Sequence, residues 1–593
     1  MKHADIVFIE YPTVVDREPF SLGFRYMVSY LRSKGVSAEI IFPPKILLSR
    51  NNQTGWPEML NSIEQIFCEG YKKQNNYFYK SIVKGILDQI QELKPLIIGF
   101  SPYDKFFVPI LDYIKFLRIK GVRSHITIGG HYATLAARQI LETVPEIDSV
   151  VCGEGELTIC ELLERVKTRA GLNGVPGLIY RDGKKIVLNQ PRRLIDDLDS
   201  IPSPDTNVFA ERLNRREMSF FSPSVSSSRG CYGNCSFCTI REFYSQGDGK
   251  RWRTVSPSKF VSEIDYLSKK FGFKKFNIVD DDFIGPGRIG LERFREISKQ
   301  IKHKKMRISF VINARVCDLD ENKIKMLKEI GLNSVFLGIE SMSKNCLSRF
   351  NKRLKVENSI KAISLLKKYG ILSYFGFIFF DPLISVEDIK SNLKIIDIIR
   401  AKKGEEYFFP YYPLFPLIGT PVFKHLSREG LLRGDYIRGF TFKFRDKKSE
   451  FIYKLIKPLY GNIEFIRFLI YFIFGFPFNI VGVEEKLRKL NQNKAEKAIR
   501  ELFEIDEYLL LDYTYQTIKD AIKLLEKSKG GVCRKTAKMM RCDVRNVVGS
   551  LKNKAVDIFL DYLTINPDFD TKRDAVARKC NTDAGSCQIF SKT

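Results

Sequence analysis

Apolar and polar positions alternate with two different periods over the first 160 residues. Short apolar runs bounded by polar residues or glycine predict buried strands, and apolar positions three or four residues apart predict amphipathic helices. The predicted strands cover residues 6–8, 39–42, 96–100, 125–128 and 149–152, with helices over residues 22–34 and 107–118 and a partly helical insertion over residues 45–95. This order predicts an α/β domain with a doubly wound parallel sheet, which binds ligands beyond the carboxyl ends of its strands.

A second series of strands and helices follows the first. Strands are predicted over residues 275–279, 307–313, 334–339 and 373–379, separated by helices over residues 257–270, 321–330, 356–369 and 386–399. Repeated strand–helix units of this kind close into a partial or full parallel (β/α) barrel, with functional groups at the carboxyl ends of the strands. We therefore expect a second α/β domain that is a partial barrel.

The remaining segments connect and extend these two domains. Residues 161–221 are predicted to be a connector that contains a hairpin around Asp182 and Gly183. Residues 431–593 have mostly helical patterns. The predicted organisation is therefore a ligand-binding domain over residues 1–160, the connector, a barrel domain over residues 222–430 and a helical C-terminal region.

The apolar stretch from Phe468 to Val483 contains no charged residue. It is shorter than the roughly 20 residues that a membrane-spanning helix needs, and Gly475 and Pro477 interrupt it. We expect a core or interfacial segment, with contact to a membrane surface as the alternative.

The charge and the cysteine content indicate which partners and which cellular compartment to expect. The 593 residues carry a formal net charge of +28, and the basic residues are spread along the chain. Such an excess can attract anionic partners, but we find no nucleic-acid-binding module and do not expect nucleic-acid recognition. The sequence has 12 cysteines, and its first residues show no basic-then-apolar secretion signal. A reducing cytoplasm is the expected compartment.

Three cysteines lie close together in the run from Ser226 to Cys238. Cys231, Cys235 and Cys238 are separated by three and two residues. Thiolates at this density favour a soft metal or an iron–sulfur cluster, and Gly230 and Gly233 would let the backbone fold tightly around it. Three thiolates leave one iron of a four-iron cluster open to substrate. The alternatives are three buried thiols or a zinc site, although zinc sites usually carry paired Cys-x-x-Cys units or sets of cysteine and histidine.

This loop resembles the cluster motif of the radical S-adenosylmethionine (SAM) enzymes, and Phe237 matches the aromatic residue common before the third cysteine. The resemblance implies a 4Fe-4S cluster on Cys231, Cys235 and Cys238. Its open iron would chelate SAM, and one electron would cleave SAM to a 5'-deoxyadenosyl radical. These cysteines are therefore the predicted catalytic and metal-binding residues. An external one-electron donor of the flavodoxin or ferredoxin type is implied as a partner.

The N-terminal half resembles the cobalamin-binding domain that precedes many radical SAM cores. The matching features are Ser101, the turn Gly129-Gly130 and the turn Gly153-Glu154-Gly155-Glu156. The resemblance implies that Ser101, Gly129, Gly130, Gly153 and Glu154 bind cobalamin. The first loop, residues 11–23, lacks the histidine that ligates cobalt in many cobalamin proteins, which leaves Tyr103 and His131 as candidates. A flavodoxin-like domain that binds nothing is the alternative.

Polar residues end the strands of the second domain. Asp280, Asp281, Arg315 and Glu340 follow three successive predicted strands. The resemblance implies that the aspartates lie near the methionine amine of SAM, that Arg315 pairs with its carboxylate or with an acid, and that Glu340 contacts the ribose. The run from Phe380 to Leu383 departs from the Gly-x-Pro-x-Glu pattern of the fifth strand, whereas Gly419-Thr420-Pro421 retains a late motif of the core.

The resemblance covers about residues 1–430 and implies a cobalamin-dependent radical SAM enzyme. Such an enzyme would methylate an unactivated carbon or phosphorus, with two molecules of SAM consumed. Cyclisation, rearrangement or sulfur insertion without methyl transfer is the alternative chemistry, and a non-catalytic redox module is the alternative class. The substrate would be a small molecule, a peptide or a lipid. Cys533, Cys542, Cys580 and Cys587 match no ligand spacing.

Overall fold

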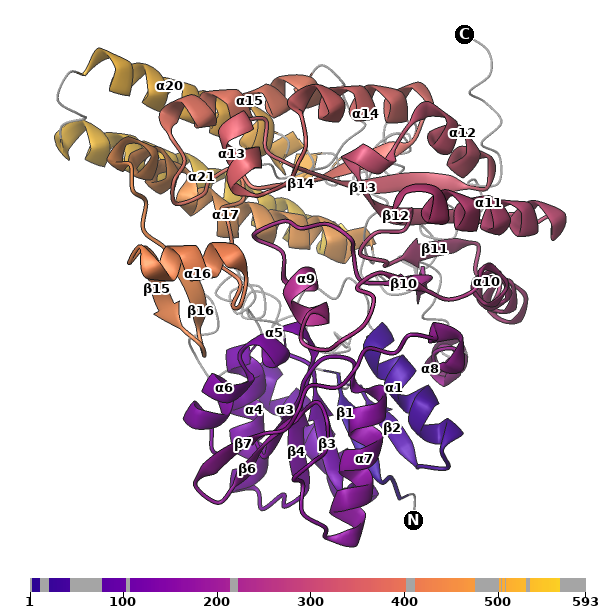
Figure 1. Cartoon of the computed structure of the whole chain (residues 1–593). Helices are drawn as coiled ribbons and strands as arrows, with labels where there is room; N and C mark the ends of the chain where they lie inside the picture. The colour runs from indigo at the N-terminus through magenta and orange to yellow at the C-terminus, as the bar shows by residue number, and fades with distance from the viewer. Residues whose placement is uncertain are drawn as a thin grey trace.

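The computed structural model describes residues 3–10, 21–42, 77–102, 107–213, 222–400, 411–474, 497, 501–502, 504–506, 508–528 and 534–565. Two α/β domains lie one above the other, and the C-terminal helices pack against the second (Figure 1). The helices α5 (Gly130–Leu135) and α9 (Thr239–Tyr244) lie where the two domains meet (Figure 1). This boundary positions the site described below.

A seven-stranded sheet forms the N-terminal domain. Its order is β2-β1-β3-β4-β5-β6-β7, and its strands are β1 (Ile6–Ile9), β2 (Ala38–Ile41), β3 (Ile97–Phe100), β4 (His125–Ile128), β5 (Ser149–Val151), β6 (Leu178–Asp182) and β7 (Lys185–Leu188). The first five strands are parallel, which confirms the predicted doubly wound sheet. The hairpin β6–β7 of the predicted connector pairs antiparallel with β5, so it extends this sheet.

Both faces of this sheet are buried. Successive side chains of a strand point to opposite faces, and the strands are apolar at consecutive positions, so each face carries apolar side chains. In β1, Val7 and Ile9 belong to one core cluster, whereas Ile6 and Phe8 belong to another on the opposite face. The accompanying helices are α1 (Leu22–Ser33), α3 (Tyr77–Leu93), α4 (Phe107–Ile119), α5, α6 (Ala137–Thr143) and α7 (Gly155–Thr168). The predicted boundary at residue 160 falls inside α7.

The second domain is an open, five-stranded parallel sheet in the order β14-β13-β12-β11-β8. Its strands are β8 (Ser224–Val225), β11 (Lys275–Ile278), β12 (Ser309–Arg315), β13 (Leu332–Glu340) and β14 (Leu372–Phe377). The helices are α8 (Asn207–Leu213), α10 (Pro257–Phe271), α11 (Gly287–His303), α12 (Glu321–Glu329), α13 (Lys344–Arg349), α14 (Val356–Lys368) and α15 (Val386–Arg400), with short 3₁₀ turns at Leu198–Ser200 and Val316–Asp318. The predicted partial barrel is confirmed.

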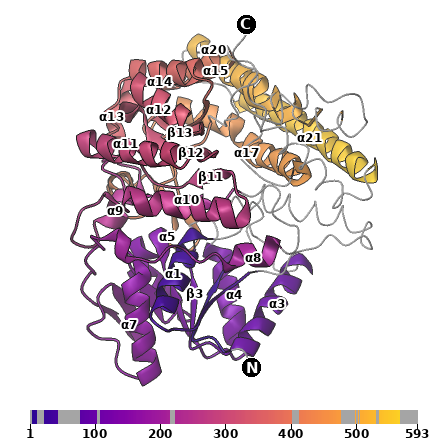
Figure 2. The ribbon, with the colours of Figure 1, turned by 90° about the vertical axis from the view of Figure 1, so that its right-hand side faces the viewer.

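The C-terminal region adds helices to the second domain. It contains α16 (Pro421–Arg428), α17 (Lys447–Phe474), a π-helical segment at Tyr508–Tyr513, α20 (Thr514–Lys527) and α21 (Arg534–Ile565). Figure 2 shows α17, α20 and α21 together beside the second sheet, and apolar side chains of all three belong to its core cluster. The predicted helical character is confirmed.

One hairpin in this region was not predicted. The strands β15 (Leu432–Asp435) and β16 (Gly439–Phe442) pair antiparallel, and Leu432, Tyr436 and Phe440 pack on a core cluster of the N-terminal domain. The Tyr132 hydroxyl donates a hydrogen bond to the carbonyl oxygen of Tyr436. The hairpin therefore ties the C-terminal region back to the first domain.

Among the helices of the described part, none is both long enough and apolar enough to cross a bilayer. The apolar stretch Phe468–Val483 enters α17 as far as Phe474, and residues 475–483 lie outside the described residues.

Candidate cofactor site at the domain boundary

The three cysteines lie on one loop between β9 (Ser228–Arg229) and α9. Cys235 is buried, and Cys231 and Cys238 are half-buried. Backbone contacts fix the loop: Ser236 N donates to Phe350 O at 2.9 Å, and Cys238 N donates to Cys235 O at 3.3 Å. The ring of Phe237 packs edge-on against Phe350 with centroids 5.5 Å apart. The loop is thus held in a fixed shape by the second domain.

The chemistry of these thiols fits a bound metal cluster. Burial raises the pKa of Cys231 to about 11 and the pKa of Cys238 to about 12, although hydrogen bonds from Gly233 and Ile240 oppose the shifts. Buried thiols of this kind are not reactive nucleophiles at neutral pH. A coordinated metal deprotonates them outright, so a metal centre can use them as ligands.

In the described part of the chain, no group of three or more His, Cys, Asp and Glu side chains is positioned to hold a single metal ion. In a four-iron cluster each thiolate ligates a different iron, and three thiols on one loop suit such a cluster.

Arg315, at the end of β12, lies against the cysteine loop. Its Nη1 is 4.0 Å from Cys231 Sγ, and its guanidinium lies 4.6 Å from the centroid of the Tyr232 ring. A Cβ atom at Gly233 would lie 1.8 Å from Arg315 Nη1 and 3.3 Å from Cys231 Sγ. Only glycine admits this approach, which brings a permanent positive charge beside the thiolates.

The two predicted aspartates have different surroundings. Asp280 is 1% exposed, and its carboxylate accepts hydrogen bonds from Ser227 N at 2.6 Å and Ser228 Oγ at 2.7 Å, as well as from the hydroxyls of Ser226 and Ser227. Asp281 is half-buried and accepts from Gly230 N at 3.2 Å. Burial, helped by Asp280, raises the pKa of Asp281 to about 7. Asp280 thus holds the serines that lead into the loop.

Glu340 ends β13 beside a lysine that the sequence analysis did not identify. Lys352 Nζ donates to Glu340 Oε1 at 2.8 Å, and both side chains are buried. Burial opposes the charge of Lys352, but Glu340 and Cys235 together raise its pKa. Lys352 lies 12 residues after Glu340 in the printed sequence, and no motif marks it. The structure therefore links Glu340, Lys352 and Cys235.

The carboxyl edge of the N-terminal sheet gathers the small residues that the sequence singled out. Gly130 has φ +87°, and a Cβ there would lie 2.7 Å from Ser101 Oγ. Gly153 has φ +75°, and its amide donates to Thr134 Oγ1 at 3.1 Å. No atom lies within 4 Å of a Cβ built at Gly153. The edge is therefore open at Gly153 and closely packed at Gly130, and its small residues fit the approach of a large flat cofactor such as cobalamin.

Glu154 is engaged differently from its neighbours. Its oxygens accept from Arg229 at 2.9 Å, Arg253 at 2.8 Å and Ile195 N at 2.8 Å. Arg229 directly precedes Gly230 and Cys231, a position that could have marked it in the sequence. Glu154 therefore connects the N-terminal domain with the loop that carries the cysteines.

His131 also contributes to this boundary. Its ring centroid lies 4.1 Å from that of Phe243 in α9, and burial lowers the pKa of His131 to about 4. The imidazole is therefore neutral. Tyr103, the other candidate for cobalt, and residues 11–20 of the first loop lie outside the described residues.

Comparisons with known proteins agree with this geometry. The family model of the radical SAM superfamily matches residues 225–396, and that of the B12 binding domain matches residues 53–163. An uncharacterized methyltransferase of Pyrococcus horikoshii is 29% identical over 63% of this chain and 79% of its own length. The anaerobic magnesium-protoporphyrin IX monomethyl ester cyclase of Synechocystis is 26% identical over 53% of this chain and 60% of its own length.

A solved structure shares the fold over nearly the whole chain. The cobalamin-dependent SAM radical enzyme OxsB, with aqua-cobalamin and SAM bound, superposes with a TM-score of 0.63 at 20% identity, over 99% of this chain and 85% of its own. The fold and the cysteine loop define a radical SAM enzyme. With its B12 binding domain, the chain belongs to the cobalamin-binding radical SAM enzymes, whose cofactors are a 4Fe-4S cluster, SAM and cobalamin.

Proposed function

We propose that this protein is a methyltransferase that uses cobalamin and radical chemistry to methylate an unactivated carbon. The observation that carries the proposal is the juxtaposition of the cysteine loop with the small-residue edge of the N-terminal sheet. His131 follows Gly130 at that edge and packs on Phe243, five residues beyond Cys238. Two cofactors bound at these places would face each other across the domain boundary.

Different residues would hold the different cofactors. When bound, the cluster and SAM supply a 5'-deoxyadenosyl radical, and cobalamin supplies a transferable methyl group. Cys231, Cys235 and Cys238 would hold the cluster, with Arg315 offsetting the negative charge beside Cys231. Asp281, Arg315 and Glu340 would orient SAM, whose amine, carboxylate and ribose match an acid, a cation and a hydrogen-bond acceptor.

Two of the predicted residues take supporting roles in this scheme. The carboxylate of Asp280 is occupied by serines, so we assign it to positioning the loop. Ser101, Gly129, Gly130 and Gly153 would let the corrin approach the backbone closely, since bulkier side chains at those strand ends would block it. The side chain that would ligate cobalt stays a prediction. Of the two candidates, only His131, which is neutral, lies within the described residues.

The setting and partners follow from this chemistry. Radical SAM enzymes need a reductant, and we propose a flavodoxin- or ferredoxin-type donor, since the excess of basic residues would attract an acidic protein. An oxygen-sensitive cluster fits a reducing cytoplasm. The substrate class stays a small molecule, a peptide or a lipid. A lipid substrate would fit contact with a membrane surface through the apolar stretch of residues 468–483.

Cyclisation is the second candidate, because cyclases are among the relatives. Both candidates need the same cofactors, so the decisive experiment begins with them. The protein is reconstituted with iron and sulfide without air, and hydroxocobalamin and SAM are added. We expect about four irons per chain, a retained corrin absorption band and release of 5'-deoxyadenosine upon reduction.

Single variants sharpen this test. Cys235→Ala should lose the spin resonance signal of the reduced cluster. Cys317→Ala is the matched control, because Cys317 lies in the neighbouring turn 3.8 Å from the Tyr232 hydroxyl and is exposed. Iron lost equally from both variants, or a wild-type protein that retains neither iron nor corrin, would refute the proposal. Transfer of labelled methyl from cobalamin into product then separates methylation from cyclisation.

A further inference from the structure

Two arginines and two glutamates form a chain of three ion pairs between the domains. Arg229 and Arg253 are direct partners in the antiparallel pair of β9 and β10 (Arg253–Thr254). Arg229 Nη1 donates to Glu154 Oε1 at 2.9 Å, and its Nη2 donates to Glu156 Oε1 at 2.5 Å. Arg253 Nη1 donates to the other oxygen of Glu154 at 2.8 Å. We call these four residues the interdomain ion-pair network.

This network is almost completely buried. The exposed fractions of the side chains are 17% for Arg229, 5% for Glu154, and 3% each for Glu156 and Arg253. Two positive and two negative charges balance. Buried ion pairs often contribute little net stability, because desolvation offsets their attraction. Their directional hydrogen bonds, by contrast, fix the relative position of the groups they join.

The network joins the two segments that carry the proposed cofactor positions. Arg229 is two residues from Cys231, and Glu154 follows Gly153 at the open edge of the N-terminal sheet. Aromatic rings flank the arginines: Tyr26 of α1 lies 5.4 Å from the Arg229 guanidinium, and Tyr244 of α9 lies 5.3 Å from that of Arg253. Each arginine is thus held between an acidic residue and a ring.

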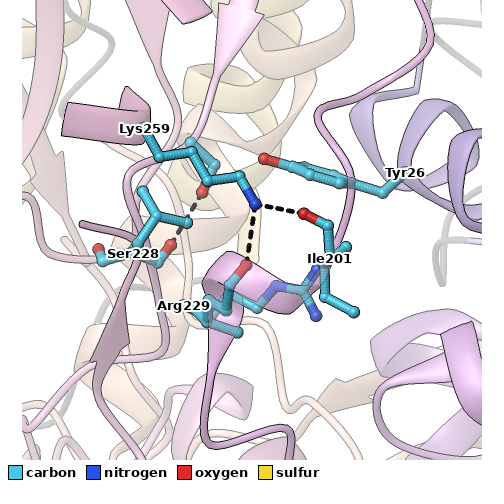
Figure 3. A pocket seen from close by; sticks show the side chains of 8 residues that line it. Tyr26, Ile201, Ser228, Arg229 and Lys259 are labelled. Atoms are coloured by element: carbon cyan, nitrogen blue, oxygen red, sulfur yellow. Dashed lines mark hydrogen bonds between the residues drawn. The ribbon is translucent and has the colours of Figure 1, made fainter. Parts of the chain in front are cut away.

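A small pocket borders the network where four segments meet. Figure 3 shows Tyr26, Ile201, Ser228, Arg229 and Lys259 around it, contributed by α1, the segment before α8, β9 and α10. Lys259 Nζ donates a hydrogen bond to the carbonyl oxygen of Ile201 and a second one, at 2.9 Å, to the carbonyl oxygen of Asp199. The connector is therefore fastened to the same corner of the second domain.

We propose that the interdomain ion-pair network is a positioning device that sets the separation between the corrin and the cluster. This inference rests on the proposed function, because it concerns the geometry of those two cofactors. Arg229 is suited to the role, since its planar fork reaches Glu154 and Glu156 with separate nitrogens. A lysine carries the same charge on a single nitrogen, so it lacks the two separate donor nitrogens that Arg229 directs at Glu154 and Glu156.

The test uses the full-length holoenzyme loaded with cluster and hydroxocobalamin. Both centres are reduced to their paramagnetic states, and pulsed electron spin resonance measures the distance between them through their dipolar coupling. The variants are Arg229→Lys and Glu156→Gln. The matched controls are Arg138→Lys and Glu142→Gln, which alter an exposed pair within α6.

We expect a narrow distance distribution in the wild type and both controls, and a broader or longer one in both network variants at unchanged iron and corrin content. Hydrogen exchange at the start of α7 and in β9 should accelerate in the network variants alone.

An unchanged distance and exchange rate in Glu156→Gln and Arg229→Lys would overturn the inference while leaving the proposed function intact. Loss of iron from Arg229→Lys, with a wild-type distance in Glu156→Gln, would also overturn it. A wild-type protein that binds no corrin or no cluster would remove the proposed function and this inference together.

Discussion

The ammonium of Lys352 donates a hydrogen bond to the carboxylate of Glu340 at 2.8 Å in a place where both are shielded from water. The backbone of Glu340 has φ +68°, and the register of β13 shifts between Gly338 and Glu340. A Cβ at Gly338 would lie 2.8 Å from both Glu340 Oε1 and Lys352 Nζ. The irregular end of the strand therefore holds a carboxylate and its cation together, and both act electrostatically on Cys235.

Removing the Lys352 cation should lower the stability of the protein. In Lys352→Met the Glu340 carboxylate would remain buried without its partner, which typically lowers the free energy of unfolding by about 3–5 kcal/mol. We also expect weaker binding of SAM to the reconstituted protein. Urea unfolding and equilibrium binding measure the two effects. Lys368→Met is the control, because its pair with Glu321 is exposed and should contribute little to stability. Equal losses in the two variants would contradict the prediction.

The close approach of Arg315 to the cysteine loop predicts intolerance at Gly233. In Gly233→Ala the new methyl group would overlap Arg315 Nη1, the end of a flexible side chain, so the guanidinium should move away from Cys231 at a small cost in stability. The iron content after reconstitution should fall. Gly171→Ala provides the comparison, since nothing lies within 4 Å of a Cβ there. Full iron retention in Gly233→Ala would show that the loop and Arg315 can adjust.

The two aspartates after β11 should behave differently when each is changed to asparagine. In Asp280→Asn, an amide nitrogen that can only donate replaces one oxygen that accepts hydrogen bonds from the serines. Each lost hydrogen bond to a charged group lowers the free energy of unfolding by about 1.5–3 kcal/mol. We expect reduced stability and reduced iron retention. Asp281→Asn should keep its iron and lose affinity for SAM. Iron analysis and SAM titration distinguish these outcomes, and the reverse pattern would exchange the assigned roles.

Burial of Glu263 in α10 predicts a pH dependence of stability. Burial raises the pKa of Glu263 to about 7, although Arg25, Lys259 and a hydrogen bond with Ser203 oppose the shift. The folded protein thus keeps a proton that the unfolded chain releases above its lower pKa, and stability should fall as the pH rises from 5 to 8. The loss is at most about 3 kcal/mol.

Glu263→Gln should reduce this fall, because the amide does not titrate, whereas Asp281, whose pKa burial also raises to about 7, should contribute the remainder. The variant should therefore be more stable than the wild type at pH 8 and similar to it at pH 5, as measured by urea unfolding at both values. Glu292→Gln, at an exposed pair with Arg288, should retain the wild-type pH profile. A wild-type profile in Glu263→Gln would place the titrating group elsewhere.

Much of the fold could be predicted because its signals are local. The apolar runs of β1, β3 and β4 and the amphipathic patterns of α1, α10 and α14 appear in the sequence, since side-chain periodicity reflects what each element buries. The hairpin β15–β16 was missed, because Leu432 and Phe440 are only partly buried and pack on a domain that is distant in the sequence. The helix α11 was also not identified; its start at Gly287 follows Pro286 without a side-chain cap.

The sequence alone determined that three cysteines within eight residues share one loop and present a soft ligand set, and the resemblance of this loop to the radical SAM motif implied the cluster. It also determined that two parallel sheets are present, since their strand patterns are local. Only the tertiary structure decided which charges meet. Glu154 joined Arg229 and Arg253, and Lys352 joined Glu340, because packing of distant segments buries these charges together and each then requires a partner of opposite sign.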